Sequence, residues 1–438
     1  MSETVINTTI VKDVISNSKF SMLHFTVFIL CLFAIMGEGY NIFLYGAVLP
    51  LLVEEWSLSP AQAGIIGSYS LVGMMLGSML FGWLADKVGR KNVIMVCIAF
   101  YSVFTALGGF ASSSELFSWY RFFAGLGIGG VVPNVIALTA DYSPRNLQNT
   151  MVSIMLCGMQ VGGILGPAIS MATMNNYGWH AVLWVGSVPL LLIPVMLKYM
   201  PDSVDFLIHK RQTEQIRKIL KSIKPDFDLK KIVLEDEGKT KVKPGIKSLF
   251  QGGRAKNNVI FCVAYFMSLL MIYGLGTWLP ELMIRTGYDV SASLVFPIIL
   301  NVGCILGTFI FAVIADKFLA PKKLLVILFL IAAGSLVLLG FKYSTIILYI
   351  LVFITGACTY GNQNLANAFV SQSYPSSVRS TGLGLCNAVG RMGAIFGTAF
   401  WGLLLQWNLP SYAVFVIFAI PALITAASYF MADNVNSL

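Results

Sequence analysis

Charged residues are scarce in this chain. Asp, Glu, Lys and Arg make up 11% of its 438 residues, whereas 57% are hydrophobic and the mean hydropathy is +0.78. A soluble domain carries roughly 25% charged residues, so this chain has too few to cover a surface that faces water. The low charge argues against an ordinary soluble protein and predicts that lipid is the main solvent for the exterior.

The residue types that usually carry catalysis or bind metals are also sparse. The three histidines, His24, His180 and His209, are scattered, and the seven cysteines lie within apolar stretches without CxxC or metal-ligand spacing. We interpret the cysteines as small buried hydrophobes. No nucleophile with its base, no metal set and no nucleotide-binding loop is apparent in the sequence. We therefore predict that the protein is not an enzyme and uses no metal or organic cofactor.

Long apolar runs, by contrast, are abundant. A helix needs about 20 mostly apolar residues to cross a bilayer, and its backbone groups must be satisfied within it. Membrane β-barrels show short alternating segments instead. The first run follows a polar head and is long enough to span, so we expect no cleavable signal peptide. We predict an all-α membrane protein with twelve spanning helices, at 22–50, 61–84, 92–111, 116–140, 147–173, 180–200, 258–281, 292–315, 322–341, 345–369, 377–405 and 411–431.

Lys and Arg are unevenly distributed over the predicted loops. Of the 29 in the chain, only Arg285 and Lys342 fall in outer loops, and Arg121 and Arg391 fall within helices. The positive-inside rule then places both termini in the cytoplasm of a protein of the inner membrane. We interpret the net charge of +9 as a topology signal and expect no nucleic acid partner. Contact of residues 198–256 with anionic lipid head groups stays open.

The two halves of the chain resemble each other. Gly46 matches Gly276, Gly125 matches Gly356, and the segment 85–87 matches 315–317. The repeat predicts two pseudo-symmetric six-helix halves, residues 1–200 and 257–438. Between them we expect a cytoplasmic linker, 201–256, that begins with an amphipathic helix on the inner face of the membrane. Parallel repeats of this kind bind substrate near the midplane, between the halves, and we expect a monomer.

Several motifs indicate a known family. Residues 82–91, Gly-Trp-Leu-Ala-Asp-Lys-Val-Gly-Arg-Lys, resemble the signature loop of the major facilitator superfamily, and residues 121–127 resemble its helix-four motif. More narrowly, the chain resembles the aromatic acid:proton symporter family. That resemblance rests on segments 45–50, 55–60, 278–280, 374–375, 379–382 and 390–393. It implies the twelve-helix fold and proton-coupled uptake of aromatic acids.

Two departures from the family pattern concern the substrate. The family usually carries Asp-Gly-x-Asp on its first helix, where this chain has Glu38-Gly39-Tyr40-Asn41. One of two carboxylates is therefore missing. The family often carries Trp four residues after the Thr of helix eleven, where this chain has Leu385.

Glu38, Arg121 and Arg391 are the ionisable candidates at membrane depth, where charge is costly, at about 2.5–3.5 kcal/mol. Asn41 and Tyr45 follow Glu38 on one helical face, which we expect to line the interior of the bundle. We interpret Glu38 and Arg121 as the proton-coupling residues. The alternative is a buried ion pair between them that only locks the N-terminal half.

Arg391 is the expected partner of the substrate carboxylate, because the guanidinium fork binds a carboxylate through two hydrogen bonds. A structural partner for backbone carbonyls is the alternative, and Arg121 could take the same role. Polar residues at similar depth are interpreted as substrate-binding, although they could also join helices. These residues are Asn41, Tyr45, Tyr69, Gln160, Tyr273, Asn301, Tyr360, Gln363, Asn364 and Asn387.

Asp86, Arg90 and Asp141 fall at the predicted inner face and are interpreted as gate charges, with a solvated charged loop as the alternative. The sequence thus predicts a secondary active transporter that takes up a small, aromatic carboxylate such as benzoate or hydroxybenzoate by alternating access, with the proton as coupling ion. The partners are the carboxylate and membrane lipid. Alternatives are transport of another organic anion, proton-driven efflux, since residues 162–167 faintly resemble an antiporter motif, and a transporter-like sensor.

Overall fold

The computed structural model describes residues 4–6, 8–223, 232–234, 249–250, 255–374, 378–407 and 409–433. Within them, twelve helical stretches are long and apolar enough to cross a membrane, which confirms the predicted number. The helices that make up these stretches are α2 (Met22–Glu55), α3 (Pro60–Val88), α4 (Arg90–Gly108), α5 (Ser114–Asp141), α6 (Gln148–Val185), α7 (Leu192–Tyr199), α10 (Ala255–Arg285), α12 (Val295–Lys317), α13 (Pro321–Leu339), α14 (Thr345–Gly356), α15 (Gln363–Gln372), α16 (Arg379–Gln406) and α17 (Ser411–Met431).

Three of the spans are composite. Gly178 has a φ of 67° and breaks α6, so that α6 carries the fifth span and the start of the sixth. The 3₁₀ turn η1 (Val188–Leu191) and α7 complete the sixth span. The eighth span begins with α11 (Val290–Ser293), and the tenth consists of α14, a π-helical turn η3 (Ala357–Gly361) and α15.

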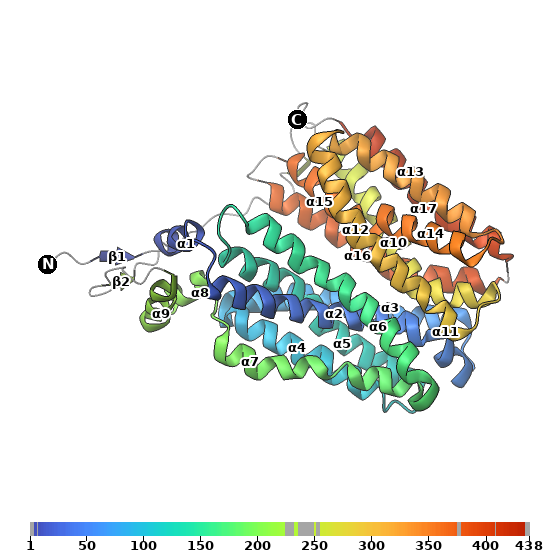
Figure 1. Ribbon diagram of the computed structural model, residues 1–438, viewed down its shortest axis with the longest axis horizontal. Coiled ribbons are helices and arrows are strands. Elements are labelled where there is room, and N and C mark those ends of the chain that lie inside the picture. Colours follow the sequence, from blue (N-terminus) through green and yellow to red (C-terminus); the bar gives the residue numbers. More distant parts are fainter. Residues whose placement is uncertain are drawn as a thin grey trace.

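Six of the described spans lie in residues 22–199 and six in residues 255–431. They form two bundles, the N-terminal one in blue to green and the C-terminal one in yellow to red (Figure 1). Within the described residues, the most extensive contacts between the halves are those of α2 with α10, α3 with α16, and α6 with α12. The predicted division into two halves therefore appears as two helix bundles. The orientation in the membrane stays a prediction, and "inner" and "outer" below follow it.

The contacts between the halves close the predicted outer side. A Cβ on Gly46 of α2 would lie 2.5 Å from the carbonyl oxygen of Gly276 on α10, and one on Gly402 of α16 would lie 2.4 Å from that of Pro60 on α3. Close by, the Ser68 hydroxyl donates to the carbonyl of Ile395 over 2.9 Å. Small residues let helix backbones approach in a membrane, so this seal depends on glycine.

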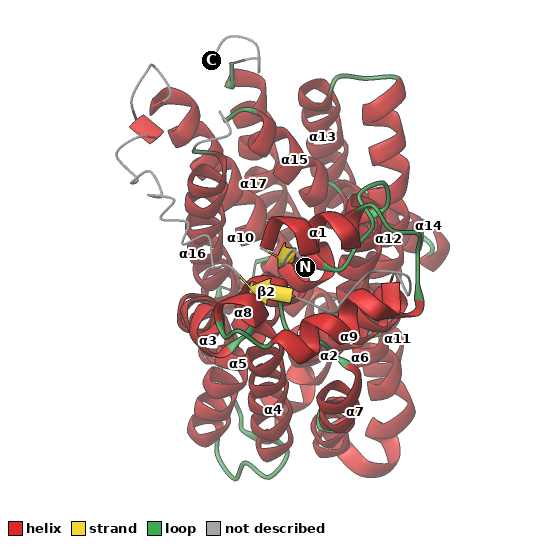
Figure 2. Cartoon of the chain, turned by 90° about the vertical axis from the view of Figure 1, so that its left-hand side faces the viewer, coloured by secondary structure: helices red, strands yellow, loops and turns green. Residues whose placement is uncertain are grey.

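The inner end carries the short elements α1 (Thr8–Ser16), α8 (Val204–His209) and α9 (Thr213–Ile223), with a parallel pair of strands, β1 (Thr4–Ile6) and β2 (Ile232–Leu234) (Figure 2). The predicted amphipathic helix is α9. Its apolar residues Ile216, Ile219 and Leu220 are buried and α9 contacts α1 and α2. The protein itself thus covers the apolar face of α9. That this segment lies at the inner face of the membrane stays a prediction. Linker residues 224–231, 235–248 and 251–254 lie outside the described residues.

Candidate functional site

A cavity of about 230 Å³ lies between the two halves. Helices α2, α3, α5 and α6 of the N-terminal half and α10, α15 and α16 of the C-terminal half supply its walls, together with η3. The cavity brings together most of the predicted site residues: Glu38, Tyr45, Arg121, Gln160, Tyr273, Tyr360, Gln363, Asn364, Asn387 and Arg391.

Glu38 is the acidic residue of this cavity, and its side chain is fully buried. Among the described residues, neither of its carboxylate oxygens has a hydrogen-bond partner. On α4, Cys97 and Tyr101 lie close enough to interact electrostatically with the Glu38 carboxylate. A buried carboxyl without hydrogen bonds is costly in the charged form, so this position is suited to a group that takes up a proton.

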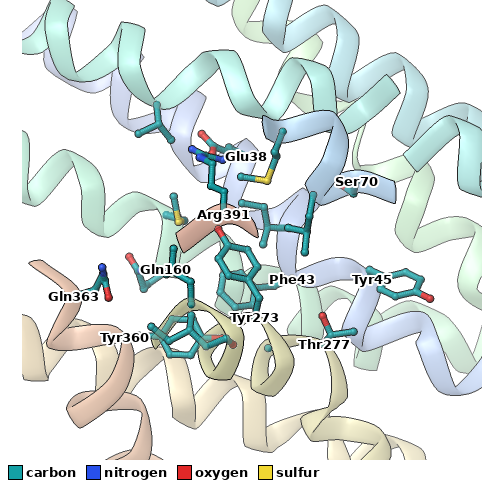
Figure 3. A pocket seen from close by; sticks show the side chains of 18 of the residues that line it. Glu38, Phe43, Tyr45, Ser70, Gln160, Tyr273, Thr277, Tyr360, Gln363 and Arg391 are labelled. Carbon is teal, nitrogen blue, oxygen red and sulfur yellow. The ribbon is translucent and has the colours of Figure 1, made fainter. Parts of the chain in front are cut away.

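Arg391 of α16 faces Glu38 from the opposite half, and Figure 3 shows the guanidinium beside the carboxyl group. The phenol group of Tyr273 on α10 lies close enough to interact electrostatically with both Arg391 and Glu38. The two side chains do not form an ion pair within 4.0 Å. The guanidinium fork of Arg391 therefore borders the cavity at the boundary between the halves.

Arg121 lines the same cavity but does not pair with Glu38, as the alternative interpretation would require. Its Nη1 donates to the backbone carbonyl of Asn41 over 3.1 Å, and its guanidinium carbon lies 5.5 Å from the centre of the Tyr45 ring. Its Nε has no partner among the described residues, although the side chain is buried. A Glu38–Arg121 ion pair that locks the N-terminal half is thus not what the structure shows.

Three predicted substrate residues lie away from the cavity wall. The Asn41 amide donates to the carbonyl of Gly37 over 2.8 Å and accepts from the Thr105 hydroxyl of α4, so it joins helices. Asn41 lies at the edge of the α2 face that carries Glu38. Its neighbour Ile42 lines the cavity instead. Tyr69 packs edge-on against Trp119 in a separate apolar groove. Asn301 is buried where α12 meets Gly163 of α6.

The sequence interpretation missed the apolar and small residues of the wall. Phe43 lies 6.0 Å from Tyr360 between ring centres, and Figure 3 shows these two rings with Tyr273 in the middle of the cavity. Ser70 and Thr277 line the outer part. Apolar residues are the rule on every membrane helix, so nothing in the sequence sets Phe43 apart from a core or lipid-facing residue.

The predicted gate charges lie on the inner side of the N-terminal half. Arg90 donates to Asp141 over 2.7 Å, and Lys12 of α1 lies 3.4 Å from the same carboxylate. Lys12 also pairs with Asp205 of α8 over 2.7 Å. Asp86 is exposed to the surroundings in this arrangement. The sequence analysis did not single out Lys12 or Asp205, because only folding brings them to Asp141.

Asp202 is a further inner-side residue that the sequence did not reveal. It accepts from the backbone N–H groups of Lys91 and Ser203, and Gly89, with a φ of 92°, packs against it. Burial raises the pKa of Asp202, and these backbone hydrogen bonds oppose the shift. Asp202 thus holds the loop between α3 and α4 to the start of the linker.

Comparison with known proteins assigns this architecture. The family model described as the Major Facilitator Superfamily matches residues 31–339 and 261–437. The chain belongs to the major facilitator superfamily. Membership makes it a multi-pass transporter of the inner membrane rather than an enzyme.

This chain has several curated relatives of nearly the same length. It is 38% identical to a benzoate transport protein of Acinetobacter baylyi, over 97% of this chain and 92% of that protein. It is 34% identical to a gentisate transporter of Corynebacterium glutamicum, over 90% and 84%. A 4-hydroxybenzoate transporter of Pseudomonas putida is 30% identical over 91% and 90%. The predicted resemblance to aromatic acid transporters is confirmed.

Solved structures share the fold of this transporter at low sequence identity. A xylose transporter of Escherichia coli, in a partially occluded inward-open conformation, superimposes with a TM-score of 0.72 at 18% identity, over 92% of this chain and 98% of that one. A bacterial homologue of the lysosomal transporter Spinster gives 0.69 at 17%, over 94% and 98%. At such identity the likeness concerns the fold alone.

Proposed function

We propose that this transporter takes up small aromatic carboxylates together with protons. The observation that carries the proposal is the approach of Glu38 and Arg391 across the two halves, inside a cavity walled by aromatic rings. A carboxylate that binds the Arg391 fork would then sit next to a carboxyl group able to hold a proton. The names of the relatives, which include benzoate, gentisate and 4-hydroxybenzoate transporters, support the same class of substrate.

The size and lining of the cavity suit a molecule with one ring. An engineered protein cavity of about 150 Å³ accommodates benzene, and this cavity measures about 230 Å³. Phe43, Tyr273 and Tyr360 offer ring faces and edges, and aromatic pairs in offset or edge-on contact contribute about 0.5–1.5 kcal/mol beyond burial. Two guanidinium groups and one carboxyl line the wall, so an anion is the favoured occupant.

Proton coupling follows from competition for Arg391. When the cavity holds no substrate, Arg391 is the counter-charge of an ionised Glu38. When a substrate carboxylate binds the guanidinium, Glu38 loses that counter-charge, and its ionised form becomes costly in a site shielded from water. Protonation of Glu38 removes the cost. Substrate and proton therefore bind together, and release of either on the inner side favours release of the other.

Proteoliposomes test the proposal. Purified transporter should accumulate radiolabelled benzoate or 4-hydroxybenzoate when the outside is acidic, and a protonophore should abolish the accumulation. An aliphatic acid such as succinate should compete poorly. Accumulation of aromatic acids driven by an alkaline outside would instead indicate exchange of substrate for protons, which is the mechanism of proton-driven efflux. Equal competition by aliphatic acids would show that the substrate is another organic anion.

A further inference from the structure

The inner part of the cavity contains two amide side chains whose orientation is fixed by hydrogen bonds. Gln363 of α15 and Asn387 of α16 both line the wall. The buried hydroxyl of Ser268 on α10 donates to Oε1 of Gln363 over 3.1 Å. Nδ2 of Asn387 donates to the carbonyl of Leu383 over 2.9 Å. Each amide thus uses one of its two polar ends within the protein.

The ends that remain are complementary. Ser268 occupies the carbonyl oxygen of Gln363, so the N–H groups of that amide are left for the cavity. Leu383 occupies the amide nitrogen of Asn387, so its oxygen is left as an acceptor. One donor and one acceptor on the wall of the same cavity match a hydroxyl group, which donates once and accepts as well. Neither amide can form such hydrogen bonds with an aliphatic group or with the edge of an unsubstituted ring.

The distance from Arg391 suits a substituent on the far side of a ring. Asn387 precedes Arg391 by four residues on α16, which corresponds to a rise of about 6 Å. Figure 3 places Gln363 and Gln160 on one side of the cavity, apart from the Arg391 guanidinium, and the rings of Phe43 and Tyr273 on the other side. A ring whose carboxylate binds Arg391 can therefore direct a remote hydroxyl toward the amides.

We propose that Gln363 and Asn387 recognise a hydroxyl group on the substrate ring, at the position meta or para to the carboxylate, and that Ser268 is the positioning residue that sets the donor end of Gln363. This inference rests on the proposed function and makes it more specific. The transporter then favours ring-hydroxylated aromatic carboxylates over unsubstituted ones. A net hydrogen bond contributes about 1 kcal/mol, so two give a preference of roughly tenfold or more.

The experiment compares benzoate with its 2-, 3- and 4-hydroxy derivatives and with 4-methoxybenzoate, in proteoliposomes carrying the full chain. The wild type should bind 3- or 4-hydroxybenzoate at least about tenfold more tightly than benzoate, as measured by the apparent KM. The 2-hydroxy compound, whose hydroxyl lies beside the carboxylate, should gain little. The methoxy compound, which has lost the donor hydrogen, should lose most of the preference.

The variants separate positioning from contact. Ser268→Ala should reduce the KM ratio between benzoate and the preferred hydroxybenzoate several-fold, with little change in the ratio of maximal rates. Ser268→Thr, which keeps the hydroxyl, should restore it. Ser335→Ala is the control, since Ser335 bonds Thr355 between α13 and α14. Equal KM values for benzoate and all hydroxybenzoates, or an unchanged ratio in Ser268→Ala, would overturn this inference. No uptake of any aromatic acid would instead overturn the proposed function.

Discussion

Glu38 of α2 and Arg391 of α16 face each other across the boundary between the two halves, which would move relative to each other in the proposed alternating access. Charges on separate rigid bodies can change their separation during transport, which two charges on one bundle cannot do as readily. Arg121 forms its contacts with Asn41 and Tyr45 inside the N-terminal half. The cross-boundary pair is therefore the better candidate for coupling.

Replacement of Arg391 by lysine tests carboxylate recognition. A lysine ammonium keeps the charge but cannot form the two parallel hydrogen bonds of the fork. Arg391→Lys should raise the apparent KM for benzoate by tenfold or more at unchanged expression. Radiolabel uptake into cells checks this, with immunoblotting as the control for expression. Normal affinity in this variant would remove Arg391 from the site.

Replacement of Glu38 by glutamine tests its role as the proton carrier. Glutamine resembles the protonated carboxyl in shape but cannot release a proton. Glu38→Gln should abolish uphill accumulation driven by pH, yet keep exchange of internal for external substrate, because exchange needs no deprotonation. The two assays use the same proteoliposomes. Uphill accumulation at the wild-type level would place the proton site elsewhere.

Membrane potential tests the number of protons. With one proton on Glu38 and one negative charge on a monocarboxylate, the loaded transporter moves no net charge. The potential, worth about 2.3 kcal/mol per elementary charge per 100 mV, then contributes nothing. A pH gradient at zero potential should drive uptake, whereas an inside-negative potassium-diffusion potential at equal pH should not. Clear acceleration by the potential alone would require a second proton.

A methyl group at Gly46 tests the outer seal. A Cβ there would lie 2.5 Å from the Gly276 carbonyl oxygen, which forces the halves apart on the outer side. Gly46→Ala should shift the population toward outward-open states and lower cytoplasmic labelling of an Asn364→Cys reporter. Gly334→Ala is the matched control, because a Cβ at Gly334 meets no atom within 4 Å. Equal labelling in both variants would contradict the seal.

Alanine substitutions rank the contacts at Asp141. The Arg90 and Asp141 side chains are 23% and 13% exposed, whereas Lys12 and Asp205 are 35% and 51% exposed. An exposed pair contributes about 0.2–1 kcal/mol, and a hydrogen bond to a less exposed charge about 1.5–3 kcal/mol. Arg90→Ala should therefore lower the thermal midpoint in detergent more than Lys12→Ala does. The reverse order would mean that α1 is the main support of Asp141.

Much of the site could be predicted because polar residues are conspicuous on a membrane helix. Glu38, Arg391 and Gln363 had to face the interior, since lipid cannot solvate them. The same reasoning failed for Asn41 and Tyr69. An amide or phenol can satisfy itself against a neighbouring helix, and the sequence does not say which neighbour it meets.

By itself, the sequence determined that twelve helices cross the membrane in two related halves, since hydrophobic length and the repeat are local properties of the chain. It also determined the chemical groups available to a substrate. Only the tertiary structure decided that Glu38 faces Arg391 rather than Arg121 and that α9 packs on α1. It also decided that the Ser268 hydroxyl orients the amide of Gln363 through a hydrogen bond. These choices depend on helix rotation and on contacts between distant segments. A helix with polar groups on more than one face can rotate to several buried arrangements, and packing against its neighbours selects one.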